Sequence, residues 1–158
     1  MVTKSAVARV SYVFAACGLL AGALLHVVVL IGGPDWIAFV GAPPSIVESA
    51  RDGTWLAPVS TLGIALLLMI WALYAYSAAG NVYRLPFCRS MLMFVAVVFV
   101  LRGLIITPAL FAGRVNWQAA IDLFIVTSSL SILAIGVSLT IGLALNAVNR
   151  RTAQGTAD

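Results

Sequence analysis

Four apolar stretches, each about as long as a membrane-spanning helix, dominate this chain, which is 63% hydrophobic and only 9% charged. A helix needs about 20 apolar residues to cross the hydrocarbon core of a bilayer. The stretches lie at residues 10–31, 57–79, 91–111 and 119–148. The sequence has too little polar chain to surround a soluble core. We therefore expect an all-α integral membrane bundle of four transmembrane helices, forming a single domain over residues 1–151.

Basic residues mark one side of the expected bundle. They are Lys4 and Arg9 before the first span, Arg84 and Arg89 between the second and third, and Arg150 and Arg151 after the fourth. Because cytoplasmic loops are enriched in Lys and Arg, we expect both termini in the cytoplasm and the protein in the plasma (inner) membrane. The basic residues are spread over the span ends rather than clustered, so no nucleic-acid partner is expected. Residues 152–158 are small and polar, which predicts a disordered cytoplasmic tail.

The first span begins after basic residues and contains a small-residue pattern at residues 21–23, both of which also occur in cleaved signal peptides. Its apolar run continues to Ile31, which is longer than the apolar core of a typical signal peptide. We therefore expect the first span to be retained.

The first external loop, residues 33–56, contains residues that typically begin and end helices, and its apolar residues recur periodically. Pro34 is placed to begin a short helix that Gly41 ends, and Pro44 to begin a second that ends by Gly53. Both segments mix apolar and charged residues and are too short to span a bilayer. We expect one or two short helices lying in the membrane interface.

Small residues share one face of the first span. Ser11, Ala15, Gly18 and Gly22 follow one another at helical spacing and lead to His26. Small side chains let helix backbones approach closely in lipid, so this face is expected to pack against another helix. The two alternatives are packing within the chain and a homodimer formed through Gly18 and Gly22.

Arg102 lies inside the third span, where a guanidinium costs at least about 2.5–3.5 kcal/mol. At 1.5 Å rise per residue, Arg102 lies about 14 Å below Phe111, and Asp122 about 8 Å below Trp117. The leading interpretation is an ion pair between Arg102 and Asp122 that fixes the third span against the fourth. The alternatives are an arginine that reaches water or the hydroxyls and carbonyls of the fourth span, and an arginine that binds an anionic substrate or lipid headgroup.

Other polar residues are expected near Arg102 and complete a candidate polar cluster or ligand site. They are His26 on the first span, Thr127 and Ser131 on the fourth, and Glu48 in the first external loop. His26 is interpreted mainly as a packing residue, with a proton relay as the alternative. Pro108 removes one backbone hydrogen bond within the third span and predicts a kink beside Arg102.

The sequence contains no recognisable catalytic motif. A single histidine and two cysteines without a CxxC pattern offer no set of metal ligands, so neither a metal nor a cofactor is expected. The leading hypothesis is a non-enzymatic binding, assembly or accessory membrane protein. The alternatives are a small oligomeric transporter or channel that uses Arg102, His26 and Asp122, and a membrane-embedded enzyme. Expected partners are the lipid bilayer, further copies of the chain or another membrane subunit, and a lipid or small anionic ligand.

Overall fold

The computed structural model describes the backbone of residues 4–154 and the side chains of residues 5–149, and this part of the chain is helical without strands. The helices are α1 (Lys4–Gly32), α2 (Pro34–Phe39), α3 (Pro44–Arg51), α4 (Leu56–Ala78), α5 (Cys88–Leu104), α6 (Thr107–Phe111) and α7 (Ala120–Gln154). Four segments are long and apolar enough to cross a membrane: Ser5–Gly32, Leu56–Ala78, Cys88–Phe111 and Ala120–Asn149. The expectation of an all-α chain with four helices of membrane-spanning length is therefore confirmed.

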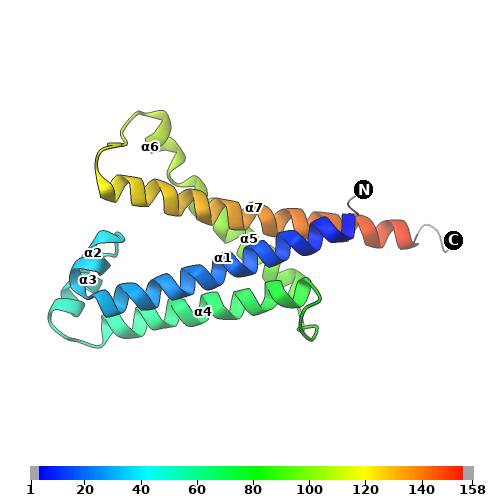
Figure 1. Cartoon of the computed structure of the whole chain (residues 1–158), viewed down its shortest axis with the longest axis horizontal. Helices are drawn as coiled ribbons and strands as arrows, with labels where there is room; N and C mark the ends of the chain where they lie inside the picture. The colour runs from blue at the N-terminus through cyan, green and yellow to red at the C-terminus, as the bar shows by residue number, and fades with distance from the viewer. Residues whose placement is uncertain (1–3, 155–158) are drawn as a thin grey trace.

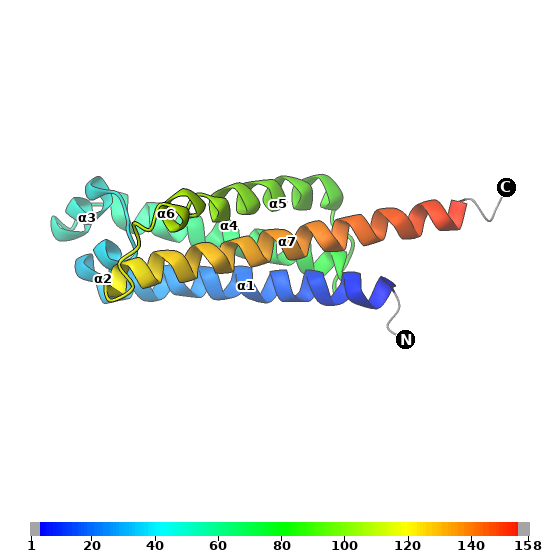
Figure 2. The same ribbon diagram turned by 90° about the horizontal axis from the view of Figure 1, so that it is seen from above.

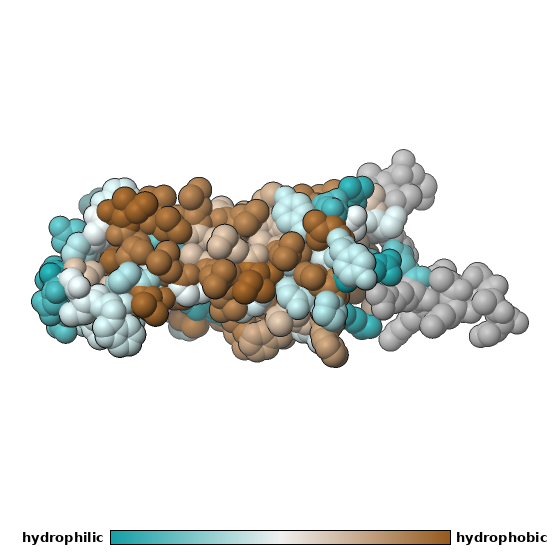
Figure 3. All heavy atoms as spheres, turned by 90° about the horizontal axis from the view of Figure 1, so that it is seen from below, coloured by the Kyte–Doolittle hydropathy of each residue, from teal (hydrophilic) through white to brown (hydrophobic). Residues whose placement is uncertain are grey.

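The long helices run side by side along one axis (Figures 1 and 2). Helix α1 packs against α4 and α7, and α5 packs mainly against α7. We call the end that carries both chain termini and the α4–α5 connection the terminal end, and the end that carries α2 and α3 the loop end. On the face shown in Figure 3, apolar side chains cover the middle of the bundle, between hydrophilic residues at both ends.

Glycine brings α5 and α7 close together. A Cβ atom added to Gly103 would lie 2.8 Å from the Cα of Leu133, and one added to Gly136 would lie 2.8 Å from the backbone nitrogen of Val100. Such distances are too short for a side chain, so the two backbones are in direct contact. This is the packing expected in lipid, where small residues at the interface allow dispersion contacts between helices.

The small-residue face of α1 packs against two helices, α4 and α7. Gly18 lies against Ile135 of α7, Gly22 lies against Leu68 of α4, and Ala15 is completely buried. The Ser11 hydroxyl donates to the carbonyl of Val7 in its own helix at 3.0 Å. In the structure these glycines therefore contact helices of the same chain.

The third span is interrupted rather than continuous. Helix α5 ends at Leu104, and α6 begins at Thr107 with Pro108 in its first turn. Proline lacks an N–H and its ring clashes with the carbonyl four residues earlier, which here is that of Leu104. The expected kink is therefore a break between two helices, and α6 leans away from the bundle axis (Figure 1).

The two short helices expected in the first loop are present as α2 and α3. Ser49 connects α3 to the next span, because its hydroxyl accepts a hydrogen bond from the backbone of Ala57 at 2.9 Å. At the other end of α4, the Ser77 hydroxyl donates to the carbonyl of Tyr83 at 2.8 Å and accepts from the backbone nitrogen of Leu85 at 3.0 Å. Buried serines therefore tie the loops to both ends of this helix.

Helix α7 is longer than the fourth predicted span and continues to Gln154. The predicted tail, residues 152–158, overlaps the last three residues of this helix. Its remaining residues, 155–158, lie outside the part that the structure describes.

Candidate functional site

Arg102 occupies the last turn of α5, next to the break in the third span. Its side chain is exposed and makes no hydrogen bond or ion pair with any residue that the structure describes. The C-terminal end of a helix favours a cation, because its last carbonyls lack helical partners and carry partial negative charge. Pro108 leaves the carbonyl of Leu104 without its helical donor as well. The break therefore makes this position more tolerant of a cation but supplies no counter-charge.

The expected ion pair between Arg102 and Asp122 does not form. A carboxylate oxygen of Asp122 instead accepts a hydrogen bond from the backbone nitrogen of Asn116 at 2.8 Å. The reason is the antiparallel register: Gly103 lies against Leu133, which is eleven residues beyond Asp122, or about 16 Å along α7. Counting inward from Phe111 misplaced Arg102, because α6 leans away instead of continuing the helix.

Three other members of the expected cluster, His26, Thr127 and Ser131, make hydrogen bonds within their own helices. Nδ1 of His26 lies 2.8 Å from the carbonyl oxygen of Gly22. The hydroxyls of Thr127 and Ser131 donate to carbonyls four residues earlier on α7, at 2.7 and 2.8 Å. Glu48 is exposed on α3. The structure therefore does not assemble Arg102, His26, Asp122, Thr127, Ser131 and Glu48 into one site.

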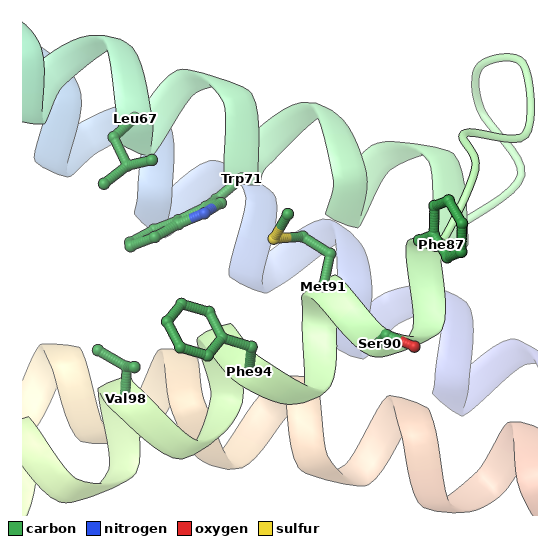
Figure 4. Close-up of a pocket in the computed structure, with 7 residues that line it drawn as sticks. All are labelled: Leu67, Trp71, Phe87, Ser90, Met91, Phe94 and Val98. Atoms are coloured by element: carbon green, nitrogen blue, oxygen red, sulfur yellow. The ribbon is translucent and has the colours of Figure 1, made fainter.

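An open apolar groove of about 680 Å³ lies between helices α4 and α5. Leu67 and Trp71 approach from α4, and Met91, Phe94 and Val98 approach from α5 (Figure 4). Helical spacing places Arg102 four residues beyond Val98, on the same side of α5. One flank of α5 thus carries a groove that ends near an unpaired cation.

A second cavity, of about 380 Å³, lies at the terminal end of the bundle. Its polar lining includes Ser77, Asn146 and two exposed arginines, Arg84 and Arg89. No acidic residue lines this cavity, and neither arginine makes an ion pair within the described chain. It is therefore a polar pocket with positive charge.

The groove and the polar pocket are not evident in the sequence, where Arg84 and Arg89 indicate only topology. Phe87, Met91, Phe94 and Val98 recur at spacings of four, three and four residues, which places them on one helix face. That aromatic and methionine-containing stripe next to two arginines was the available signal, but an apolar stripe in a span looks the same whether it faces lipid or a groove.

The two cysteines are free thiols. Cys17 lies 4.0 Å from the hydroxyl of Tyr76, and Cys88 donates to the carbonyl of Tyr74 at 3.4 Å. Within residues 4–154, His, Cys, Asp and Glu nowhere gather into a group of three that could hold a metal ion. The groups that stand out chemically are the guanidinium of Arg102 and the arginine pair of the polar pocket, and both suit binding of an anion.

Comparisons with protein-family models, with curated protein sequences and with solved structures found no match for this chain.

Proposed function

We propose that this protein is a non-enzymatic assembly or accessory subunit of a membrane complex, and that Arg102 binds a carboxylate in a span of a different membrane protein. The single observation that carries the proposal is an exposed arginine within a membrane-spanning segment that has no partner among the described residues. A guanidinium in hydrocarbon is costly and normally pairs or faces water. A partner molecule is the counterpart that this chain does not supply.

A carboxylate suits Arg102 better than other groups. The planar guanidinium binds a carboxylate through two parallel hydrogen bonds, which also fixes the orientation of the partner. Arg102 lies fourteen residues from Cys88, the first residue of α5, or about 21 Å into the span. Lipid headgroups at the terminal end cannot reach this depth, whereas an acidic side chain on a neighbouring transmembrane helix can. In a core about 30 Å thick, a headgroup at the loop end, about 9 Å away, is the competing ligand.

The partner is a different chain rather than a second copy. Two copies that stand side by side in the same orientation bring equal depths together, so Arg102 would face only another Arg102. Asp122 is the one acidic residue of the described spans, and it lies about 16 Å farther along. A homo-oligomer therefore leaves the guanidinium unpaired.

The proposed orientation places the terminal end in the cytoplasm and the protein in the plasma membrane. Arg9, Arg84 and Arg89 lie at the terminal end, while Asp35, Glu48 and Asp52 belong to the segment of α2 and α3 at the loop end. This asymmetry supports the orientation, because positive charge is retained on the cytoplasmic side. Helices α2 and α3 then lie at the external interface.

A transporter or channel built on Arg102, His26 and Asp122 is not favoured by the geometry. His26 binds its own helix, and Asp122 binds the loop that precedes α7. The register places the two charged groups at different depths.

The test is photo-crosslinking in native membranes with a crosslinking amino acid at position 101. Leu101 is 62% exposed and adjoins Arg102, while Leu24 on α1, 64% exposed, is a matched control position. The expected product is a membrane protein whose crosslinked span contains Asp or Glu. It should be lost with Arg102→Leu, weakened but still detectable with Arg102→Lys, which keeps the charge without the bidentate geometry, and absent from position 24.

A charge exchange then makes the test specific. Arg102→Glu should abolish the crosslink, and replacing the partner's acidic residue by arginine should restore it. The proposal fails if position 101 crosslinks only lipid, or if Arg102→Leu leaves the protein crosslink unchanged.

A further inference from the structure

The groove and the polar pocket lie next to each other. Phe87 and Ser90 line both cavities, at the point where α5 begins. The groove continues from there between α4 and α5 to Val98, and Phe87 and Ser90 stand at its terminal end (Figure 4). The two cavities therefore form one elongated site with an apolar part and a polar part.

The dimensions of the apolar part match one leaflet of a bilayer. From Phe87 to Val98 the groove follows eleven residues of α5, or about 16 Å. The hydrocarbon core of a bilayer is about 30 Å thick, so this length is about half of it. Phe94 is 58% exposed, so the groove opens sideways toward the surrounding lipid. An acyl chain can enter it without leaving the membrane.

The polar part lies where a lipid headgroup would be. Arg84 and Arg89 line the polar pocket, which has no acidic residue in its lining. The acidic residues of the described chain all lie elsewhere: Asp35, Glu48, Asp52 and Asp122. Basic pockets between transmembrane helices bind anionic lipid headgroups. Charge therefore selects an anionic headgroup over a zwitterionic one.

We propose that the α4–α5 groove and the polar pocket bind one anionic phospholipid from the leaflet at the terminal end. The phosphate lies against Arg84 and Arg89, and an acyl chain lies between Trp71, Phe94 and Val98. A transmembrane helix is about 10–12 Å wide with its side chains and would lie over this groove rather than in it. A free anion would use the polar pocket but leave the groove empty.

The site does not depend on Arg102. The lipid headgroup occupies the terminal end of the groove, and Arg102 lies beyond Val98 at the opposite end. The proposed partner subunit and the lipid can therefore be tested separately.

The experiment uses Trp71 as a reporter inside the groove. The full chain is prepared with Trp36, Trp55 and Trp117 replaced by phenylalanine, which leaves Trp71 as the only one of the four tryptophans. It is reconstituted in phosphatidylcholine vesicles with graded fractions of phosphatidylglycerol or phosphatidylcholine that carry bromine on the acyl chain. Bromine quenches tryptophan fluorescence at contact, so quenching reports an acyl chain in the groove.

The expected result is that brominated phosphatidylglycerol quenches Trp71 at a mole fraction roughly five- to tenfold lower than brominated phosphatidylcholine. Arg84→Gln with Arg89→Gln should remove this preference, and lysine at both positions should keep most of it. Arg51→Gln with Arg114→Gln makes the same change of charge at the loop end and should leave the preference intact, as should Arg102→Leu.

Three outcomes would overturn the proposal. The first is a preference for phosphatidylglycerol that survives the loss of Arg84 and Arg89. The second is equal quenching of Trp71 by both lipids. If that quenching is also weak, protein rather than lipid covers the groove. The third is stabilisation of the protein by glycerol 3-phosphate that depends on Arg84 and Arg89 and that phosphatidylglycerol does not diminish, because a soluble anion would then be the ligand of the polar pocket.

Discussion

The two flanks of α5 are built differently. Toward α7, Gly103 and Gly136 remove side chains where the two helices meet, and the backbones come into contact. Toward α4, the large side chains of Trp71, Met91 and Phe94 hold the helices apart and leave a groove of about 680 Å³. Because apolar helices gain nothing from leaving water when they are already in lipid, contact between them depends on how closely they fit. Small residues fix α5 on one flank, and large residues keep the other flank open.

This contrast explains how one helix can be both anchored and available for binding. The contact with α7 is the more extensive one, and α4 adds a smaller contact in which the rings of Trp71 and Phe99 meet. The opposite flank can then present the groove and Arg102 to other molecules.

The largest effect is expected from Gly103→Leu on the closed flank. Even the first added carbon would lie 2.6 Å from Cβ and 2.8 Å from Cα of Leu133. Overpacking a close contact costs about 1–3 kcal/mol and sometimes more. Because the obstacle here is backbone, we expect a loss of about 3 kcal/mol or more, measured as a large fall in thermal stability in detergent.

The control for this prediction is Gly63→Ala in α4, where an added Cβ has no neighbour within 4 Å. Its thermal stability should equal or exceed that of the wild type, because alanine favours the helix. Tolerance of Gly103→Leu would mean that the two backbones are not in contact.

Arg102→Leu should raise the thermal stability of the isolated chain, whereas Gly103→Leu should lower it. With no partner among the described residues, the guanidinium adds a cost of about 2.5–3.5 kcal/mol on insertion scales. We therefore expect the purified monomer to gain stability toward thermal unfolding. A loss of stability would instead show that Arg102 supports the bundle from within.

The spans and the short helices could be predicted because their signals are local. A run of about 20 apolar residues determines a span, and Pro34 and Pro44 mark where α2 and α3 begin. The ion pair could not be predicted, because the level of Asp122 relative to Arg102 depends on which residues of α5 and α7 touch. The contact between Gly103 and Leu133 sets that register, and nothing in the sequence indicates that these two residues meet.

The groove could not be predicted for a related reason. Phe94 and Val98 would have the same apolar character whether they faced lipid, a core or a cavity. Only the divergence of α4 from α5 distinguishes these cases. The same applies to Arg84 and Arg89, because the sequence pattern predicts an orientation from them but does not indicate their position beside the groove.

A smaller effect is expected on the open flank from Trp71→Leu. The rings of Trp71 and Phe99 meet edge to face with centroids 5.8 Å apart, which is the main aromatic contact across this flank. Such pairs contribute about 0.5–1.5 kcal/mol beyond their buried area. We expect a loss of about 1 kcal/mol in detergent unfolding, and a smaller one for Phe94→Leu, whose ring has no such contact.

The smallest effect is expected in a double-mutant cycle between Arg102 and Asp122. The two residues share no contact, and Asp122 is engaged by the backbone of Asn116 at 2.8 Å. Changes at separated sites add to within about 0.3–0.5 kcal/mol. Arg102→Leu and Asp122→Asn should therefore show additive effects on unfolding free energy, within this margin. A coupling energy of about 1 kcal/mol or more would indicate that the two residues do form an ion pair. That pair would require α7 to slide by several turns relative to α5. The closed flank of α5 forbids that movement, because Gly103 and Gly136 fit only where they now lie.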